Sequence, residues 1–177
     1  MASSLDGMIA KPDNSVGWFE TKDEYEDGIE LSKEDSTAFL KTIDCYVMGS
    51  KTYELALDLS REYGWGYGDT PTKVLTSRNL PVERPGVELY SGDLDTFVSE
   101  VLRPNYRNVW VAGGSMVAKE FLRAGLADEI RLSVLPIILG GGKPFFEEIG
   151  REIPLHLKDV KAYKTGIVEM VYEILKT

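Results

Sequence analysis

Two short segments of the sequence place glycine and hydroxyl side chains directly after an apolar run. Residues 43–48 are followed by Gly49-Ser50-Lys51-Thr52, and residues 109–112 by Gly113-Gly114-Ser115-Met116-Val117. Free backbone N–H groups at the start of a helix bind phosphate, and the helix dipole favours the negative charge there. Glycine lets a ligand approach the backbone closely. The two segments therefore predict phosphate contacts, while a purely structural strand-to-helix turn is the alternative for each.

A third polar segment lies between these two. Ser77 and Arg78 follow the apolar pair Val74-Leu75. The planar guanidinium of an arginine binds phosphate at two points, and a neighbouring hydroxyl adds a further donor. We expect Ser77 and Arg78 either to meet an additional ribose phosphate or to form a solvated strand end.

Three single residues bear on other kinds of chemistry. The dipeptide Asp6-Gly7 is typical of a turn, but a carboxyl at the end of a sheet could also orient a substrate or pass a proton. Cys45 lies within an apolar run, which is typical of a small core residue. His156, the only histidine, has leucine on both sides and is interpreted as structural or exposed. We therefore predict no metal site and no hydrolase triad.

Length and charge limit the class of protein. A chain of 177 residues fits one domain, so we expect a single domain over residues 1–177. The net charge of −9 repels phosphate backbones and anionic lipid, so neither nucleic acid nor a membrane is expected as a partner. No apolar stretch approaches the roughly 18 residues of a membrane span, and a cytoplasmic protein is expected.

Short β-rich runs alternate with amphipathic patterns, which indicates an α/β protein with helices on the faces of a sheet. The predicted strands cover residues 44–48, 73–76, 87–90, 109–112 and 129–135. Helices are predicted over 32–42, 50–59, 93–102 and 115–124, with Ser50, Asp93 and Ser115 as N-caps. Residues 153–164 and 167–175 predict a closing antiparallel hairpin around Thr165-Gly166. A hairpin that ends a mainly parallel sheet makes the sheet mixed.

Taken in order, these segments resemble the dihydrofolate-reductase-like superfamily. Within it the chain is most similar to the reductase domain of the riboflavin-biosynthesis deaminase-reductase, the RibD C-terminal type. The resemblance covers nearly the whole chain, and its carriers are Ser4-Leu5-Asp6-Gly7-Met8-Ile9-Ala10, Val47-Met48-Gly49-Ser50-Lys51-Thr52-Tyr53-Glu54, Val111-Ala112-Gly113-Gly114-Ser115, and residues 125–130 continuing to 136–146. It implies a three-layer αβα fold whose mixed, mostly parallel sheet ends in the antiparallel hairpin.

The resemblance also implies a function and a set of site residues. We expect an NADPH-dependent oxidoreductase, similar to 5-amino-6-(5-phosphoribosylamino)uracil reductase, that transfers hydride to a pyrimidine- or pterin-like substrate. The cofactor would lie against residues 49–52 and 113–117, its 2′-phosphate against Ser77 and Arg78, and its nicotinamide near Ile9 and Ala10. Asp6 is the candidate catalytic residue, and Ser4 and Trp18 are the candidate substrate residues. A homodimer is expected.

Departures from the family pattern keep alternatives open. The start of the second helix, Gly49-Ser50-Lys51-Thr52-Tyr53, is closer to dihydrofolate reductase, and the riboflavin enzyme's Asp-Asn-Pro segment has no clear match. Dihydrofolate reductase activity and a non-catalytic NADPH-binding domain are therefore the alternative functions. Trp18 either caps the site or packs against its own loop. The acidic residues 20–30 form either a solvated loop or a lid.

Overall fold

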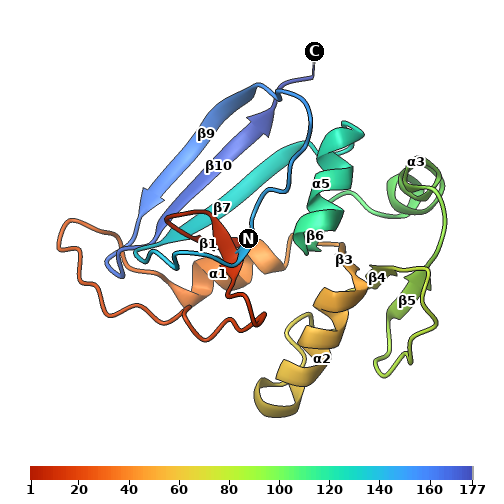
Figure 1. Cartoon of the computed structure of the whole chain (residues 1–177), viewed down its shortest axis with the longest axis horizontal. Coiled ribbons are helices and arrows are strands. Elements are labelled where there is room, and N and C mark those ends of the chain that lie inside the picture. Colours follow the sequence, from red (N-terminus) through yellow and green to blue (C-terminus); the bar gives the residue numbers. More distant parts are fainter. Residues whose placement is uncertain (177) are drawn as a thin grey trace. The chain divides into compact units, whose positions relative to one another are not determined.

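The computed structural model of the chain describes residues 1–176, apart from the side chains of Lys33 and Asp35 (Figure 1). Two compact units divide the chain: one contains Met1–Ser36 and the residues from Ala127 onward, and the other contains Thr37–Leu126. The chain passes from the first unit into the second within α1 (Lys33–Leu40). That residues 1–177 form a single domain is still a prediction.

The first unit is built on a four-stranded sheet in the order β1-β7-β10-β9. Its strands are β1 (Ala2–Ser4), β7 (Glu129–Leu135), β9 (Leu155–Ala162) and β10 (Val168–Ile174). β1 runs parallel to β7, whereas β10 is antiparallel to both of its neighbours. Two short strands, β2 (Met8–Ala10) and β8 (Lys143–Pro144), form a separate antiparallel pair. The predicted C-terminal hairpin is confirmed (Figure 1).

The second unit is built on a fully parallel sheet in the order β5-β4-β3-β6. Its strands are β3 (Cys45–Gly49), β4 (Thr72–Leu75), β5 (Val87–Tyr90) and β6 (Val109–Gly113). The first four residues of β3 are buried, as expected for a parallel strand that is covered on both faces. The helices are α2 (Ser50–Tyr63), α5 (Ser115–Arg123), and the consecutive segments α3 (Leu94–Thr96), η1 (Phe97–Leu102) and α4 (Arg103–Asn105).

Together these elements confirm an α/β fold that has parallel strands, a mixed sheet and C-terminal antiparallel strands. Within the described residues, no helix combines the length and the apolar character that crossing a bilayer would require.

An aromatic cluster forms the core around α2. Tyr46, Met48 and Tyr53 are buried there, and Trp65 and Tyr67 pack against them from the glycine-rich loop that follows α2. That loop therefore contributes to the core of its own unit. Cys45 is fully buried, and burial raises the pKa of its thiol to about 11, which confirms the interpretation of a core residue.

The N-terminal ends of the helices differ from the sequence prediction at two positions. Asp93 caps α3 as predicted, because its carboxylate accepts the N–H of Thr96 at 2.8 Å. The prediction of Ser50 and Ser115 as caps is wrong: both are the first helical residues, with Gly49 and Gly114 as the N-caps. The reason is that β3 continues to Gly49 and β6 to Gly113, so little or no chain separates strand from helix.

The acidic segment of residues 20–30 is tethered to the C-terminal hairpin. The backbone N–H of Tyr25 donates to the carbonyl of Lys164 at 2.7 Å, and that of Ile29 donates to Ala162 at 2.9 Å. Gly28 lies so close to the hairpin that a Cβ atom there would overlap the backbone of Lys164. The segment is thus neither a purely solvated loop nor a lid free along its length, because part of it is fixed along the hairpin.

Candidate functional site

The two strand–glycine–helix junctions lie side by side in the second unit. β3 pairs with β6, with Met48 opposite Gly113, so α2 and α5 begin at the same edge of the sheet. A Cβ atom on Gly49 would lie 3.1 Å from Cγ2 of Val117, and one on Gly114 would lie 3.3 Å from Oγ1 of Thr52. Each junction therefore contacts the first turn of the other helix, and together they form one surface.

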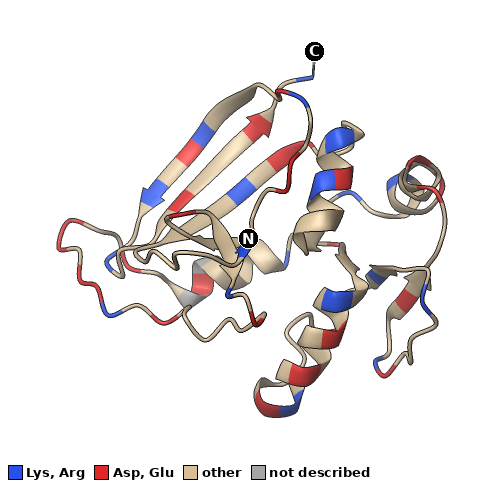
Figure 2. Cartoon of the chain, viewed as in Figure 1, with Lys and Arg blue, Asp and Glu red and all other residues tan. Residues whose placement is uncertain are grey.

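The chemistry of this surface suits an anion. Neither α2 nor α5 has a side-chain hydrogen bond at its N-cap, because both N-caps are glycines. The first N–H groups of a helix point out of its N-terminal end and carry the positive end of the helix dipole. In α5, the N–H of Val117 donates to the carbonyl of Gly114 at 3.0 Å. Lys51 adds a positive charge in the first turn of α2, whereas acidic side chains follow further along the helix (Figure 2). This surface has the donors for a phosphate group.

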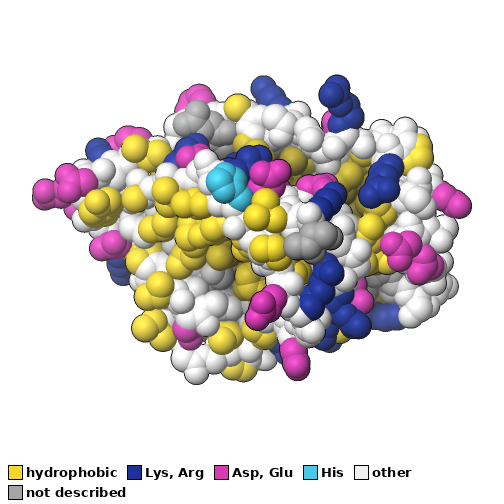
Figure 3. Space-filling model, turned by 90° about the horizontal axis from the view of Figure 1, so that it is seen from above, with side chains coloured by type: hydrophobic (Ala, Val, Ile, Leu, Met, Phe, Trp, Pro, Cys, Tyr) yellow, Lys and Arg dark blue, Asp and Glu magenta, His cyan; other side chains and the backbone are white. Residues whose placement is uncertain are grey.

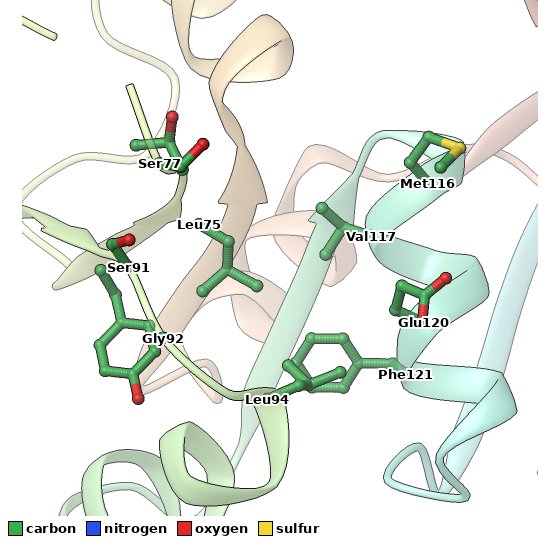
Figure 4. A pocket seen from close by; sticks show the side chains of 11 residues that line it. Leu75, Ser77, Ser91, Gly92, Leu94, Met116, Val117, Glu120 and Phe121 are labelled. Carbon is green, nitrogen blue, oxygen red and sulfur yellow. The ribbon is translucent and has the colours of Figure 1, made fainter. Parts of the chain in front are cut away.

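A cavity of about 330 Å³ opens within the same unit (Figure 4). Its walls come from the carboxyl ends of β4 and β5, the start of α3 and one face of α5, and they consist of Leu75, Thr76, Ser77, Tyr90, Ser91, Gly92, Leu94, Met116, Val117, Glu120 and Phe121. The lining is mainly apolar, with hydroxyl groups on the β4 and β5 side. Such a cavity suits a flat heterocycle that carries a few polar groups.

Three of the predicted cofactor residues, Ser77, Met116 and Val117, line this cavity. Arg78 is the next residue after Ser77, and its guanidinium donates to both carboxylate oxygens of Glu54, at 2.9 Å and 2.7 Å. This pairing raises the pKa of Arg78 and lowers the pKa of Glu54, so both groups are charged at neutral pH. Arg78 thus lies beside the cavity with a carboxylate partner that the sequence does not indicate.

In the first unit, Ser4 and Asp6 form a hydrogen-bonded turn between β1 and β2. The hydroxyl of Ser4 donates to Asp6 at 2.6 Å and accepts the N–H of Met8 at 2.9 Å. The Asp6 carboxylate also accepts the N–H groups of Leu139 at 3.0 Å and Gly140 at 2.8 Å. The Ser4 hydroxyl and these N–H groups lower the pKa of Asp6, which keeps it ionised at neutral pH.

The remaining predicted residues of the first unit lie in β2 and in the loop after it. Ile9 and Ala10 belong to β2, and Gly142 comes so close to the Ala10 carbonyl that no side chain would fit there. Trp18 is 5% exposed and stacks edge-on against Phe19 with ring centroids 4.6 Å apart. Its indole Nε1 is buried without a hydrogen-bond partner among the residues that the structure describes.

Sequence reasoning missed part of the cavity. Ser91 and Gly92 follow the end of β5 in the way that Gly114 follows the end of β6, so the same strand-end signal could have found them. Tyr90, Leu94, Glu120 and Phe121 carry no such signal, because an apolar or helical pattern does not show which side faces a cavity. Glu54 stands out in the sequence only as part of a family motif.

The chain is therefore an α/β protein in which the starts of α2 and α5 form a surface with donors for a phosphate group. A mainly apolar cavity lies beside this surface. The RibD C-terminal domain family matches residues 1–169, and the chain belongs to this family.

Individual relatives agree with this assignment. YwjB, an uncharacterized protein of Bacillus subtilis (strain 168), is 31% identical over 167 residues, which cover 94% of this chain and 91% of YwjB. A 2,5-diamino-6-ribosylamino-4(3H)-pyrimidinone 5′-phosphate reductase of Aquifex aeolicus is 34% identical over 86 residues, 41% of this chain and 38% of that protein.

Solved structures show the same fold. A protein from Shewanella sp. PV-4 matches with a TM-score of 0.83 at 23% identity, over 99% of this chain and 97% of that one. The diaminohydroxyphosphoribosylaminopyrimidine deaminase/5-amino-6-(5-phosphoribosylamino)uracil reductase of Thermotoga maritima matches with a TM-score of 0.69 at 17% identity. That match covers 98% of this chain and 55% of the Thermotoga chain.

Proposed function

We propose that the chain is an NADPH-dependent reductase that transfers hydride to a pyrimidine- or pterin-like ring. The observation that carries this proposal is the joint surface of α2 and α5 beside the cavity, since a dinucleotide needs both phosphate donors and a place for a flat ring. Membership of the RibD C-terminal domain family supports the reductase activity.

The residues of the second unit would hold the nucleotide. Gly49, Ser50, Lys51 and Thr52 would bind the pyrophosphate from one side, and Gly113, Gly114, Ser115, Met116 and Val117 from the other. Ser77 and Arg78 would bind the 2′-phosphate. NADPH supplies a hydride when it is bound. The contribution of the protein would be to orient the reacting groups and to exclude water.

We propose roles for five residues of the first unit. Ile9 and Ala10 would contact the nicotinamide. Trp18 would cap the substrate site, with its indole N–H turned into the protein and without an acceptor among the described residues. Of the two roles open to Asp6, orientation is favoured over proton donation, since hydrogen bonds hold its carboxyl in the ionised form. Ser4 would act through Asp6, because its own hydroxyl is buried and already bonded.

We also propose that two copies associate through one face of the β1-β7-β10-β9 sheet. Apolar side chains of three adjacent strands share that face by the strand register: Ile130, Leu132, Val134, Leu155, Leu157, Val160, Val168, Met170 and Tyr172. Leu157 is 47% exposed and Val160 is 55% exposed. Figure 3 shows hydrophobic side chains gathered on one side of the molecule. An apolar face of this kind is typical of a protein–protein interface.

The test is a fluorescence titration with NADPH, followed by an NADPH oxidation assay with a panel of substrates. We expect saturable NADPH binding and oxidation with an aminopyrimidine ribosyl phosphate. No binding at millimolar NADPH by the folded protein would overturn the proposal. Oxidation with dihydrofolate alone would instead establish the folate activity. Binding without oxidation across the panel would establish a non-catalytic nucleotide-binding domain.

A further inference from the structure

Arg78 and Glu54 form a two-point ion pair on the surface of the second unit. Nη1 of Arg78 donates to Oε2 of Glu54 at 2.9 Å, and Nη2 donates to Oε1 at 2.7 Å. The side chains are 54% and 43% exposed, so a ligand can reach both. The Glu54 carboxylate thus binds the side of the guanidinium that carries both Nη atoms. A phosphate can bind an arginine at two points through this same side.

The backbone on both sides of the pair is fixed. The N–H of Arg78 donates to Oγ1 of Thr76 at 3.0 Å, and Thr76 and Ser77 line the cavity. Next to Glu54 on α2, the hydroxyl of Tyr53 donates to the Pro81 carbonyl at 3.3 Å and accepts the N–H of Glu83 at 3.2 Å. These bonds tie α2 to the segment after β4, so Glu54 is held beside the residues that line the cavity.

The charge of Glu54 acts differently on the two nicotinamide dinucleotides. A 2′-phosphate carries about −1.5 to −2 charges at pH 7. To bind Arg78, it must displace the Glu54 carboxylate or share one guanidinium with it, and both are unfavourable. A 2′-hydroxyl is neutral and can donate a hydrogen bond to a carboxylate, as ribose hydroxyls do in other dinucleotide sites. Glu54 therefore opposes the phosphate and tolerates the hydroxyl.

We propose that Glu54 is a cofactor-specificity residue that restrains the preference of this chain for NADPH over NADH. This inference rests on the proposed nucleotide site. It deepens that proposal, because Arg78 alone would give a strong phosphate preference, and Glu54 neutralises part of its charge.

The experiment compares 2′,5′-ADP with 5′-ADP by isothermal titration of the full-length protein. In the wild type, the ratio of the two affinities reports the strength of discrimination. Glu54→Gln keeps the size of the side chain and removes its charge, and we expect the ratio to rise in favour of 2′,5′-ADP by about threefold to tenfold. Arg78→Gln in the Glu54→Gln background should abolish that gain.

Glu62→Gln is the matched control, because it removes the same charge from an exposed position later in α2. The control should leave the ratio at its wild-type value, and circular dichroism should show that each variant is folded. Glu54→Ala is a second variant, and we expect it also to raise the affinity ratio in favour of 2′,5′-ADP.

The outcomes separate this inference from the proposed function. An unchanged or lower ratio in Glu54→Gln and Glu54→Ala, with both ligands still binding, would overturn the role of Glu54 alone. A lower ratio would mean that Glu54 orients Arg78 for the phosphate. If the wild type binds neither ligand, the nucleotide site itself is wrong, and the role of Glu54 is overturned with it.

Discussion

The carboxylate of Asp6 and the backbone N–H of Gly140 are joined by a hydrogen bond of 2.8 Å, although 134 positions separate the two residues in the chain. A second bond, from the N–H of Leu139, holds the same carboxylate. Together these bonds tie the turn between β1 and β2 to the glycine-rich loop before β8. One ionised side chain therefore adds to the backbone bonds Leu5 N–H to Ile137 O and Phe145 N–H to Gly7 O in holding that loop.

The first prediction concerns the pH dependence of that tie. Asp6 has a lowered pKa in the folded protein, so its stabilising contribution is present above the ordinary aspartate pKa of about 3.9 and is lost as the pH falls through the folded pKa. We expect Asp6→Asn to lower the melting temperature at neutral pH and to matter progressively less in acid. Thermal unfolding from about pH 3 to pH 8 measures this.

Asp58→Asn is the control for Asp6→Asn, since Asp58 is exposed and pairs with Arg61 at 3.5 Å on the surface of α2. Its melting curve should follow the wild type across the pH range. If the melting temperatures of Asp6→Asn and the wild type differed by the same amount at every pH, the stabilising role of the ionised Asp6 carboxylate would be contradicted.

The second prediction concerns the glycines where α2 and α5 meet. Alanine at Gly49 would approach Val117 at 3.1 Å, and alanine at Gly114 would approach Thr52 at 3.3 Å, so both methyl groups intrude on the proposed phosphate surface. We expect each substitution to weaken NADPH binding by about tenfold through lost backbone contacts. Titration of NADPH fluorescence gives the dissociation constants.

Gly66→Ala serves as the comparison for these variants, because its Cβ would meet no atom within 4 Å. It should bind NADPH like the wild type. Wild-type affinity in both Gly49→Ala and Gly114→Ala would argue that these glycines have a structural role only.

The third prediction concerns the apolar face of the first unit. Leu157→Lys places a charge on the β9 side of that face, and we expect it to weaken dimerisation by at least about tenfold. His156→Lys changes the neighbouring residue, whose side chain points to the opposite face, and it should leave the dimer intact. Light scattering coupled to size-exclusion chromatography across a range of concentrations distinguishes the two. A monomeric wild type at high concentration would refute the proposed association.

The fourth prediction concerns the tether between residues 20–30 and the hairpin. Gly28→Ala would drive a methyl group into the backbone of Lys164, and we expect a loss of roughly 3 kcal/mol in the free energy of unfolding. Gly17→Ala meets no neighbouring atom and should change stability little. Denaturant unfolding measures both variants. Equal stability of the two would show that the segment does not lie against the hairpin.

Much of the second unit could be predicted because its signals are local. An apolar run, a glycine and a helix starting within a few residues are enough to indicate the ends of β3 and β6. The hairpin could be predicted for the same reason, since its alternation and its Thr165-Gly166 turn are contiguous in the sequence. What these features share is that the interactions defining them lie within a few residues.

Features that depend on distant partners could not be predicted. Glu54 and Arg78 are 24 positions apart, and nothing in either segment indicates that one carboxylate will meet that guanidinium. The acidic composition of residues 20–30 is typical of a solvated loop, whereas their tether consists of backbone bonds to the hairpin. Hydrogen bonds between backbone groups cannot be inferred from the types of the side chains in a segment.

The irregularity in β9 has a consequence for how copies of the chain can aggregate. β9 is an edge strand, and its register with β10 shifts between Val171 and Tyr172, which leaves Lys158 as an extra residue. A bulge and charged side chains on an edge strand prevent another strand from adding to it and so block growth into a fibril. Open-ended stacking through this edge strand is thereby disfavoured, which agrees with the proposed association through the apolar face.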